Sequence, residues 1–152
     1  MGRFRRLILM VLAFSLWLPA EVIEKQFEVK PGSKLYVELE VGGDLVVTGW
    51  QKNVAQITVS KRGSDCRELD LRIEKISGDI HIEAESNYRD WDSDCQLDFE
   101  IMLPDNFDLD LETRGGDFNI TNITGTMEGK TMGGDLDLIR LTGNLHFVTM
   151  GG

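Results

Sequence analysis

Beyond residue 21, apolar and polar side chains alternate along the chain with a period of two. Each alternating segment places apolar residues on one side and charged or hydroxyl residues on the other, as half-buried β-strands require. The clearest segments are residues 35–41, 54–60, 69–74, 80–83, 97–103 and 107–113. Turn-forming residues separate the segments at 31–33, 42–44, 51–53, 63–65, 77–79 and 104–106. Short strands at this spacing predict an all-β fold.

The last third of the chain contains an internal repeat of 18 residues. Thr113–Lys130 aligns with Thr131–Val148, and a third copy begins at residues 149–152. The identical pairs are Thr113/Thr131, Gly115/Gly133, Gly116/Gly134, Asp117/Asp135, Thr124/Thr142 and Gly125/Gly143. A repeat of this length suits one coil of a small β-solenoid, in which two short strands are joined by tight turns. We therefore expect a single all-β repeat domain over residues 21–152, solenoid-like in its last third.

Paired glycines are predicted to form the turns of these coils, because glycine adopts positive φ at no steric cost. The pairs are Gly115-Gly116 and Gly133-Gly134, with a weaker echo at Gly42-Gly43. An aspartate follows each pair in the repeats. Asp117 and Asp135 would stack about 4.8 Å apart in successive coils, and each is expected to accept backbone N–H groups of the turn. We therefore expect Asp135→Asn to be neutral or mildly stabilising.

The amino terminus has the pattern of an export signal. Arg3, Arg5 and Arg6 precede the apolar run Leu7–Leu18, which is too short to span about 30 Å of hydrocarbon as a helix. A small residue, Ala20, follows at a suitable cleavage position. The run has no cysteine that could carry a lipid. We expect residues 1–20 to be a cleaved signal peptide and the protein to be periplasmic or secreted, with an uncleaved anchor as the alternative.

The charge of the chain excludes nucleic acid as a partner. The 152 residues include 26 acidic and 16 basic side chains, for a net charge of −10. Three of those basic residues and none of the acidic ones lie in the predicted signal, so its removal would change the charge to −13. Nucleic-acid affinity depends on Lys and Arg displacing counterions from phosphates, and so acidic a protein would repel them.

The only cysteines, Cys66 and Cys95, are expected to form a disulfide. An even cysteine count in an exported protein favours pairing. A hairpin of residues 69–76 and 80–85 would return the chain toward Cys66 shortly before Cys95. Their separation of 29 residues does not fit a Cys-x-x-Cys redox motif. Free buried thiols, or a metal or redox role, are the alternatives.

The acidic stretch of Asp90, Asp92 and Asp94 is the best candidate for a metal site. Carboxylates at alternate positions can converge on Ca²⁺, which takes six to eight oxygen ligands. An EF-hand loop would need glycine and glutamate where the chain has Cys95 and Ile101. We therefore favour a solvated acidic loop, and expect neither a metal nor a cofactor.

No motif of a hydrolase is present in the sequence. Gly-x-Ser-x-Gly and His-Glu-x-x-His are both absent, and His81 and His146 are expected to be ordinary strand-face residues. Four carboxylates could still group on one face, as in polysaccharide-active β-helices: Glu83, Glu85, Asp98 and Glu100. Charged residues that alternate with apolar ones are typical of any solvent face. We therefore expect no enzymatic activity.

Four aromatic residues could stack on sugar rings if they are exposed: Tyr36, Trp50, Tyr88 and Trp91. Trp50 follows a predicted strand and is expected to pack as a core or turn residue. Tyr88 and Trp91 lie in a polar loop and are the better candidates for surface contact.

Two features of the chain resemble the DUF4097 family of adhesin-like β-strand-repeat proteins. The first is Gly-Asp-Leu-Val-Val-Thr-Gly-Trp at residues 43–50, and the second is the Leu103-Pro104 step that leads into the Thr-x-Gly-Gly-Asp repeats. The resemblance spans residues 24–152. It implies an exported β-solenoid-like module without catalytic residues. Such proteins usually have more coils, so the resemblance also implies a short or truncated member.

The sequence therefore predicts an exported, non-catalytic, adhesin-like interaction module of the cell envelope. It does not identify the ligand, for which a glycan and a protein are the candidates. The alternative is a carbohydrate-active β-helix enzyme or its remnant. The last apolar strand, residues 145–150, has His146 as its only ionisable side chain, and charged side chains are what usually prevent an edge strand from pairing with another chain. We therefore also expect self-association through the C-terminal coil.

Overall fold

The computed structural model describes residues 21–86 and 94–152. These residues form β-strands and one short 3₁₀ helix, and the prediction of an all-β fold is confirmed. The elements are β1 (Glu21–Glu28), β2 (Lys34–Trp50), β3 (Val54–Arg62), η1 (Ser64–Glu68), β4 (Leu69–Ile76), β5 (Asp79–Ser86), β6 (Gln96–Pro104), β7 (Asp108–Gly115), β8 (Phe118–Thr121), β9 (Thr124–Thr131), β10 (Leu136–Ile139) and β11 (Thr142–Thr149). No helix in the described residues is long and apolar enough to cross a membrane. The predicted signal peptide lies outside the described residues.

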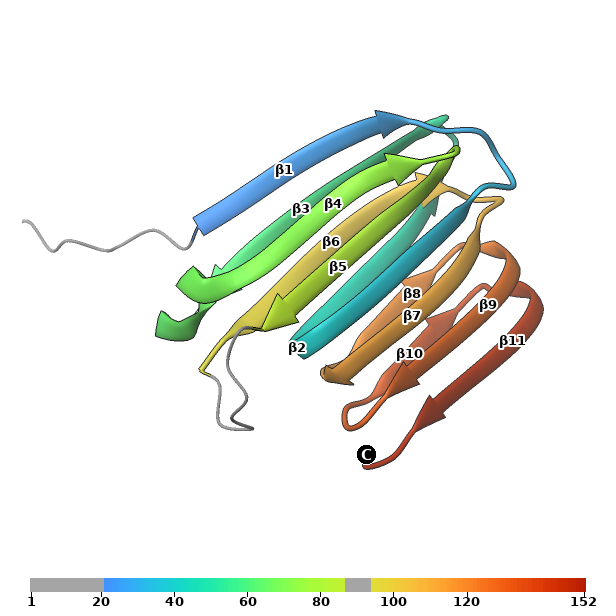
Figure 1. The fold of residues 1–152 in the computed structure, drawn as a ribbon. Helices are drawn as coiled ribbons and strands as arrows, with labels where there is room; N and C mark the ends of the chain where they lie inside the picture. The colour runs from blue at the N-terminus through green and yellow to red at the C-terminus, as the bar shows by residue number, and fades with distance from the viewer. Residues whose placement is uncertain (1–20, 87–93) are drawn as a thin grey trace, which may run out of the picture.

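The strands form one open sheet that folds over on itself into two layers (Figure 1). The first layer consists of β4, β5, the first half of β2, β7, β9 and β11. The second layer consists of β1, β3, β6, the second half of β2, β8 and β10. Strands β1 and β4 are the edges at one side of this sandwich, and β10 and β11 are the edges at the other side.

Strand β2 belongs to both layers. Its residues 34–39 pair with β5 and β7, and its residues 42–50 pair with β6 and β8. The register shifts between Leu39 and Gly42, where the strand bends from one layer into the other. The predicted turn at residues 42–44 is therefore wrong, because the backbone stays extended and bends within one strand. Gly43 lies at the bend, where a Cβ atom would come within 2.8 Å of Leu39 Cδ1 and 3.0 Å of the Leu97 carbonyl oxygen.

The C-terminal strands pair in parallel at the offset of the sequence repeat. In the second layer, Phe118 of β8 pairs with Leu136 of β10. In the first layer, Met127 of β9 pairs with Leu109 of β7 on one side and with Leu145 of β11 on the other. Equivalent residues of successive repeats thus lie side by side in the sheet.

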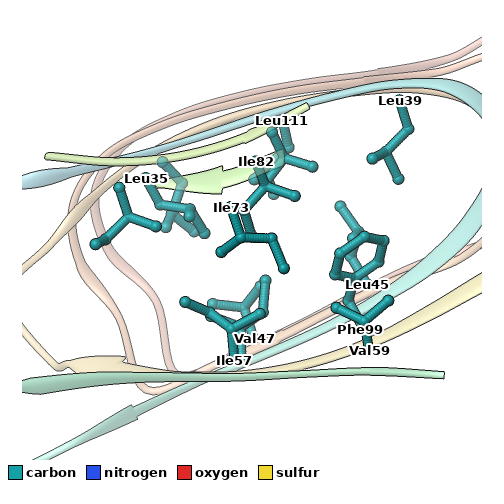
Figure 2. Close-up of a cluster of buried hydrophobic side chains, with 14 of the residues drawn as sticks. Leu35, Leu39, Leu45, Val47, Ile57, Val59, Ile73, Ile82, Phe99 and Leu111 are labelled. Carbon is teal, nitrogen blue, oxygen red and sulfur yellow. The ribbon is translucent and has the colours of Figure 1, made fainter. Parts of the chain in front are cut away.

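The core lies between the two layers and is filled by the apolar residues of the alternating segments. Figure 2 shows Leu35, Leu39, Ile73, Ile82 and Leu111 of the first layer facing apolar residues of the second. The residues that they face are Leu45, Val47, Ile57, Val59 and Phe99. All ten are buried. The period-two pattern therefore assigned eight of these residues to the inner faces of their strands correctly, whereas Leu45 and Val47 lie outside the predicted alternating segments.

Burial decreases toward the edge formed by β10 and β11. Phe118, Ile120, Ile123 and Met127 are fully buried. Phe118, Ile120 and Met127 pair with residues of the next repeat, and the Ile123 carbonyl accepts the Thr142 N–H of that repeat. The equivalent residues of that next repeat are Leu136, Leu138, Leu141 and Leu145. The first three are half-buried, and Leu145 is 44% exposed.

Candidate binding surfaces

The predicted turn glycines come together at one end of the strands, where the chain crosses between layers. We call Gly42, Gly43, Gly115, Gly116, Gly133 and Gly134 the glycine corner. Gly42 pairs with Gly115, and the Gly116 N–H donates to the Gly133 carbonyl at 2.9 Å. Successive crossings therefore stack directly on each other.

Only the second glycine of each repeat pair has positive φ, 118° at Gly116 and 124° at Gly134. A Cβ on either residue would also collide with a carbonyl oxygen of the preceding crossing, that of Gly43 or Gly116. At Gly115, by contrast, φ is ordinary and a Cβ would have its nearest contact at 3.9 Å. The expectation that both glycines of a pair supply positive φ is therefore wrong for the first glycine.

The aspartates that follow the glycines form a hydrogen-bonded ladder. The Asp44 carboxylate accepts the Asp117 N–H at 2.9 Å, and the Asp117 carboxylate accepts the Asp135 N–H at 2.8 Å. Each carboxylate thus holds the backbone of the next crossing. The predicted role of these residues as acceptors for turn N–H groups agrees with this arrangement for Asp117.

Two buried threonines form hydrogen bonds to the backbone of the glycine corner. Thr113 and Thr131 are at most 2% exposed. Each hydroxyl donates to a carbonyl two residues ahead, Gly115 at 2.7 Å and Gly133 at 2.8 Å. Their burial was missed by sequence reasoning, although their recurrence at the repeat offset was a usable signal.

The two cysteines meet beside the glycine corner. Cys66 lies in η1 and Cys95 lies just before β6, with their sulfur atoms 2.11 Å apart and their Cα atoms 4.9 Å apart. Asp65 reinforces the junction by accepting the Asp94 N–H at 2.7 Å. Both cysteines are buried. The bridge thus ties the loop before β4 to the start of β6.

A hollow of about 460 Å³ lies between this bridge and the glycine corner. Backbone of Gly42, Gly43, Gly115 and Gly116 lines it, together with Arg62, Gly63, Asp94, Cys95 and Gln96. Arg62 is held by Asp98, at 2.6 Å from Nε and 2.7 Å from Nη2, and this carboxylate raises the pKa of the guanidinium. The hollow therefore has a cation that is already paired.

The four carboxylates considered for a catalytic group are not brought together. Glu83 and Glu85 are on β5 in the first layer, whereas Asp98 and Glu100 are on β6 in the second layer. Period-two alternation placed all four carboxylates on solvent-facing sides of their strands, but it does not indicate which layer each strand belongs to. Arg72 pairs with Glu83 at 3.6 Å and with Glu85 at 2.7 Å.

The predicted acidic metal site falls largely outside the described residues, which include Asp94 but neither Asp90 nor Asp92. Tyr88 and Trp91, the favoured sugar-stacking residues, also lie outside them. Across residues 21–86 and 94–152, no three potential metal ligands gather in one place.

The outer face of the first layer carries side chains in continuous rows across the strands. One row consists of His81, Tyr36, Asp110, Glu128 and His146, each paired with the next across neighbouring parallel strands. The adjacent row consists of Glu83, Glu38, Glu112, Lys130 and Val148. We call these ten residues the row face. Neighbouring members of a row are spaced by the strand separation of about 4.8 Å.

Around Tyr36, the side chains of the row face are held in place by an aromatic stack, a cation–π contact and an ion pair. His81 stacks on Tyr36 with ring centroids 4.6 Å apart. The Lys34 ammonium lies 4.5 Å from the centre of the same ring and 3.1 Å from the Asp110 carboxylate. Burial lowers the pKa of Lys34, but Asp110 and Tyr36 together outweigh burial, so the pKa is raised.

Two shallow hollows lie on the row face. One, of about 140 Å³, is lined by Tyr36, Val37, Glu38, Asp110 and Glu112. The other, of about 180 Å³, is lined by Asp110, Leu111, Glu112, Glu128, Gly129, Lys130, His146 and Val148. Carboxylate oxygens in both are placed to accept hydrogen bonds from hydroxyl, amide or ammonium groups. Sequence reasoning missed Asp110, Glu112 and Glu128, although the repeat offset already aligned Asp110 with Glu128 and His146.

Lysines join the two edge strands at the other side of the sandwich. The Lys25 ammonium of β1 donates to the Ile73 carbonyl of β4 at 2.9 Å. The Lys75 ammonium of β4 donates to the Glu28 carbonyl of β1 at 2.6 Å. The two layers are thus linked where no strand pairs them.

Trp50 packs at the end of the strands opposite the glycine corner. Its indole N–H donates to the Val54 carbonyl at 2.8 Å, and the Lys52 ammonium lies 4.5 Å from the ring centre. These contacts agree with the expected role of Trp50 in a turn.

No model of a known protein family matches the chain, and no curated protein sequence matches it. Among solved structures, the chain is similar to a proposed cell adhesion protein from Clostridium sporogenes, with 10% identity and a TM-score of 0.37 over 87% of this chain and 100% of that one. It is also similar to a proposed adhesin from Bacteroides fragilis, with 15% identity and a TM-score of 0.37 over 76% of this chain and 61% of that one. A third similar structure is a proposed lipid-binding protein from Parabacteroides distasonis, with 11% identity and a TM-score of 0.35 over 84% of this chain and 62% of that one. At these TM-scores the function has to be inferred from the chain's own surfaces.

Proposed function

We propose that the protein is an exported, non-catalytic, adhesin-like module that binds a repetitive surface polymer through its row face. Membership of the DUF4097 family, a solenoid-like stack of 18-residue coils within a domain of residues 21–152, and a cleaved signal at residues 1–20 are parts of this proposal. The observation that carries it is the in-register alignment of the two rows, from His81 to His146 and from Glu83 to Val148.

Regular rows favour a repetitive ligand because each unit of a polymer can meet an equivalent set of groups. The carboxylates of Glu38, Asp110, Glu112 and Glu128 can accept hydrogen bonds from the hydroxyls of a neutral glycan or from amide groups of a protein. The acidic rows disfavour a polyanionic chain, since like charges repel. A neutral glycan is therefore the ligand class that we propose.

The disulfide supports a location in the cell envelope or outside the cell. Disulfides persist in the periplasm and outside the cell, and they are rare in the reducing cytosol. The Cys66–Cys95 bridge is buried and joins distant segments, as expected of a structural bridge. We therefore propose a periplasmic or secreted location.

A binding assay with insoluble neutral glycans tests the proposed function. The protein is incubated with each matrix, and both retained protein and released reducing ends are measured. We expect retention without release, and loss of retention in the double variant Asp110→Asn/Glu112→Gln. The matched control is Glu100→Gln/Asp137→Asn, which removes the same charges from the outer face of the second layer. Release of reducing ends, or equal retention of both variants, would contradict the proposal.

We also propose that the protein self-associates through β10 and β11. These strands present Ile139, Leu145 and Val148 with 40–44% of each side chain exposed. An edge that combines apolar side chains with unpaired backbone groups favours strand addition. We expect a concentration-dependent dimer in sedimentation velocity that Leu145→Lys reduces. A monomer at all concentrations would contradict this part of the proposal.

A further inference from the structure

At the end of the strands opposite the glycine corner, the loops after β1 and β2 (residues 29–33 and 51–53) carry lysine and no acidic residue, in contrast to the acidic protein as a whole. Lys30, Lys52 and Lys75 lie in or beside the loops that follow β1, β2 and β4. A hollow of about 390 Å³ between these loops is lined by Glu28, Val29, Lys30, Asn53, Val54 and Lys75. We call Lys30, Lys52, Lys75 and the neighbouring Ile76 the lysine end.

The cations of the lysine end are available to a ligand. Within the described part of the chain, none of the three ammonium groups forms an ion pair with a carboxylate. Lys75 donates to a carbonyl, and Lys52 lies over the ring of Trp50. The nearby Asp105 carboxylate accepts a hydrogen bond from the Gln51 side-chain amide, and the Asp79 carboxylate accepts the backbone N–H of Lys34 at 2.9 Å. Glu28, Asp79, Asp105 and Asp108 are carboxylates at the same end of the strands, and they compete with an incoming anion for these cations.

An exposed apolar side chain lies beside these cations. Ile76 is 47% exposed and ends β4, directly before the tight turn made by Ser77 and Gly78. Val29 and Val54 contribute apolar surface to the adjoining hollow. The lysine end thus offers ammonium groups and hydrocarbon in the same small area. A bilayer surface with anionic headgroups presents both complements, whereas a polyanionic glycan presents only the charge.

The opposite end of the strands is acidic and would orient the molecule. It carries Asp44, Asp65, Asp94, Asp117 and Asp135. A strand of eight residues such as β5 spans about 26 Å, whereas the Debye length at physiological ionic strength is about 8 Å. A molecule that touches an anionic surface with its lysine end therefore keeps these carboxylates beyond the range of strong repulsion.

From this polarity we infer that the lysine end docks on a bilayer surface that carries anionic phospholipid headgroups, with Ile76 entering the interface. The inference rests on the proposed envelope function and adds a membrane partner to it. Docked in this way, the protein stands with its strands along the bilayer normal. The row face then remains open to a polymer ligand.

Co-sedimentation with vesicles tests this inference. The protein is mixed with vesicles of phosphatidylglycerol and phosphatidylcholine, and separately with vesicles of phosphatidylcholine alone. We expect binding to the anionic vesicles only, and weaker binding as salt is raised. Because one cation near an anionic bilayer contributes about 1 kcal/mol, we expect Lys30→Glu to lower the partition coefficient by about fivefold or more. Ile76→Ser should lower it while the salt dependence stays unchanged.

The matched control is Arg67→Glu, which makes the same change of charge in η1, at the acidic end. We expect Arg67→Glu to bind like the wild type. Equal loss in Lys30→Glu and Arg67→Glu would overturn the inference, because net charge alone would then govern binding. Equal binding to neutral vesicles, or full displacement by soluble polyphosphate with no effect of Ile76→Ser, would overturn it as well. Failure here would leave the glycan assay unaffected, since that assay reports on Asp110 and Glu112.

Discussion

The edge strands at the two sides of the sandwich, β1 and β4 at one side and β10 and β11 at the other, are joined to the rest of the sheet by different contacts. At the side of β1 and β4, the edge strands pair in antiparallel fashion with their neighbours, and Lys25 and Lys75 link them across the core. At the side of β10 and β11, parallel strands repeat the same contacts at an offset of 18 residues. The comparison shows that strands of the next sequence repeat are added by the same contacts as those of the repeat before, whereas the edge at β1 and β4 is joined by residues that do not repeat.

Four expected outcomes test this contrast. The largest effect should come from the disulfide on the non-repeating side. Replacing Cys66 and Cys95 with serine releases a loop of 29 residues, and chain-entropy estimates put the loss at about 3.5 kcal/mol. Urea denaturation of the oxidised wild type and of the variant measures the difference. The fully reduced wild type should unfold like the variant, and a loss below about 1 kcal/mol would show that the repeats alone hold the fold.

The second test compares equivalent positions of successive repeats. Met127 is fully buried by the strand that pairs with it, whereas Leu145 has no such cover and is 44% exposed. We expect Met127→Ala to cost about 3 kcal/mol, the usual range for a buried side chain, and Leu145→Ala to cost less than about 1 kcal/mol. Thermal unfolding measures both. Equal losses would mean that pairing with the next repeat does not govern the burial of these side chains.

The third test uses adjacent glycines of one crossing. Gly116→Ala combines a positive φ with a collision against the Gly43 carbonyl, and we expect a loss of about 2 kcal/mol or more. Gly115→Ala meets neither obstacle and should change stability by less than about 0.5 kcal/mol. Chemical denaturation distinguishes them. A destabilised Gly115→Ala would indicate that the corner needs both glycines for a reason other than space or φ.

The smallest effect should come from the lysine links between β1 and β4. Lys25→Met keeps most of the side-chain length but removes the ammonium that donates to the Ile73 carbonyl, so we expect a loss of about 1 kcal/mol. Faster hydrogen exchange of amides in β1 and β4, with β9 and β11 unchanged, would locate the effect at that edge. Lys130→Met is the control, because Lys130 is paired with Glu112 on the row face, far from β1.

The sequence predicted most of the strands and their inner faces, the hairpin of β4 and β5, and the acceptor role of Asp117, but it named neither β1 nor the second half of β2 as a strand. The predicted features depend on neighbours in the chain or on the repeat offset, which a single sequence displays. It did not predict the bend of β2 at Gly42 and Gly43, because a glycine pair reads as a turn unless the long-range pairing is known. The separation of Glu83 from Asp98 was missed for a related reason, since alternation with period two is the same in both layers.

The row face was missed in the same way, apart from the part aligned by the repeat. Tyr36 meets His81 and Asp110 only after β2 has paired with β5 and β7, and no local pattern specifies that register. The lysine links are likewise invisible in sequence, because Lys25 and Lys75 occupy positions that alternation alone would assign to the interior.

The double membership of β2 has a consequence for the order in which the chain can fold. Leu45 lies between Phe99 and Phe118 in the sheet, and Leu35 lies between Ile80 and Leu109. During synthesis, therefore, β2 cannot pair with its neighbouring strands until residues 79–121 have emerged from the ribosome. Until then its apolar side chains remain exposed to solvent. Distant pairing of this kind slows folding, since loop-closure entropy is lost before contacts form. Each later strand pairs with a strand 18 residues before it, so the slow step should be the pairing of β2, followed by rapid addition of strands toward β11.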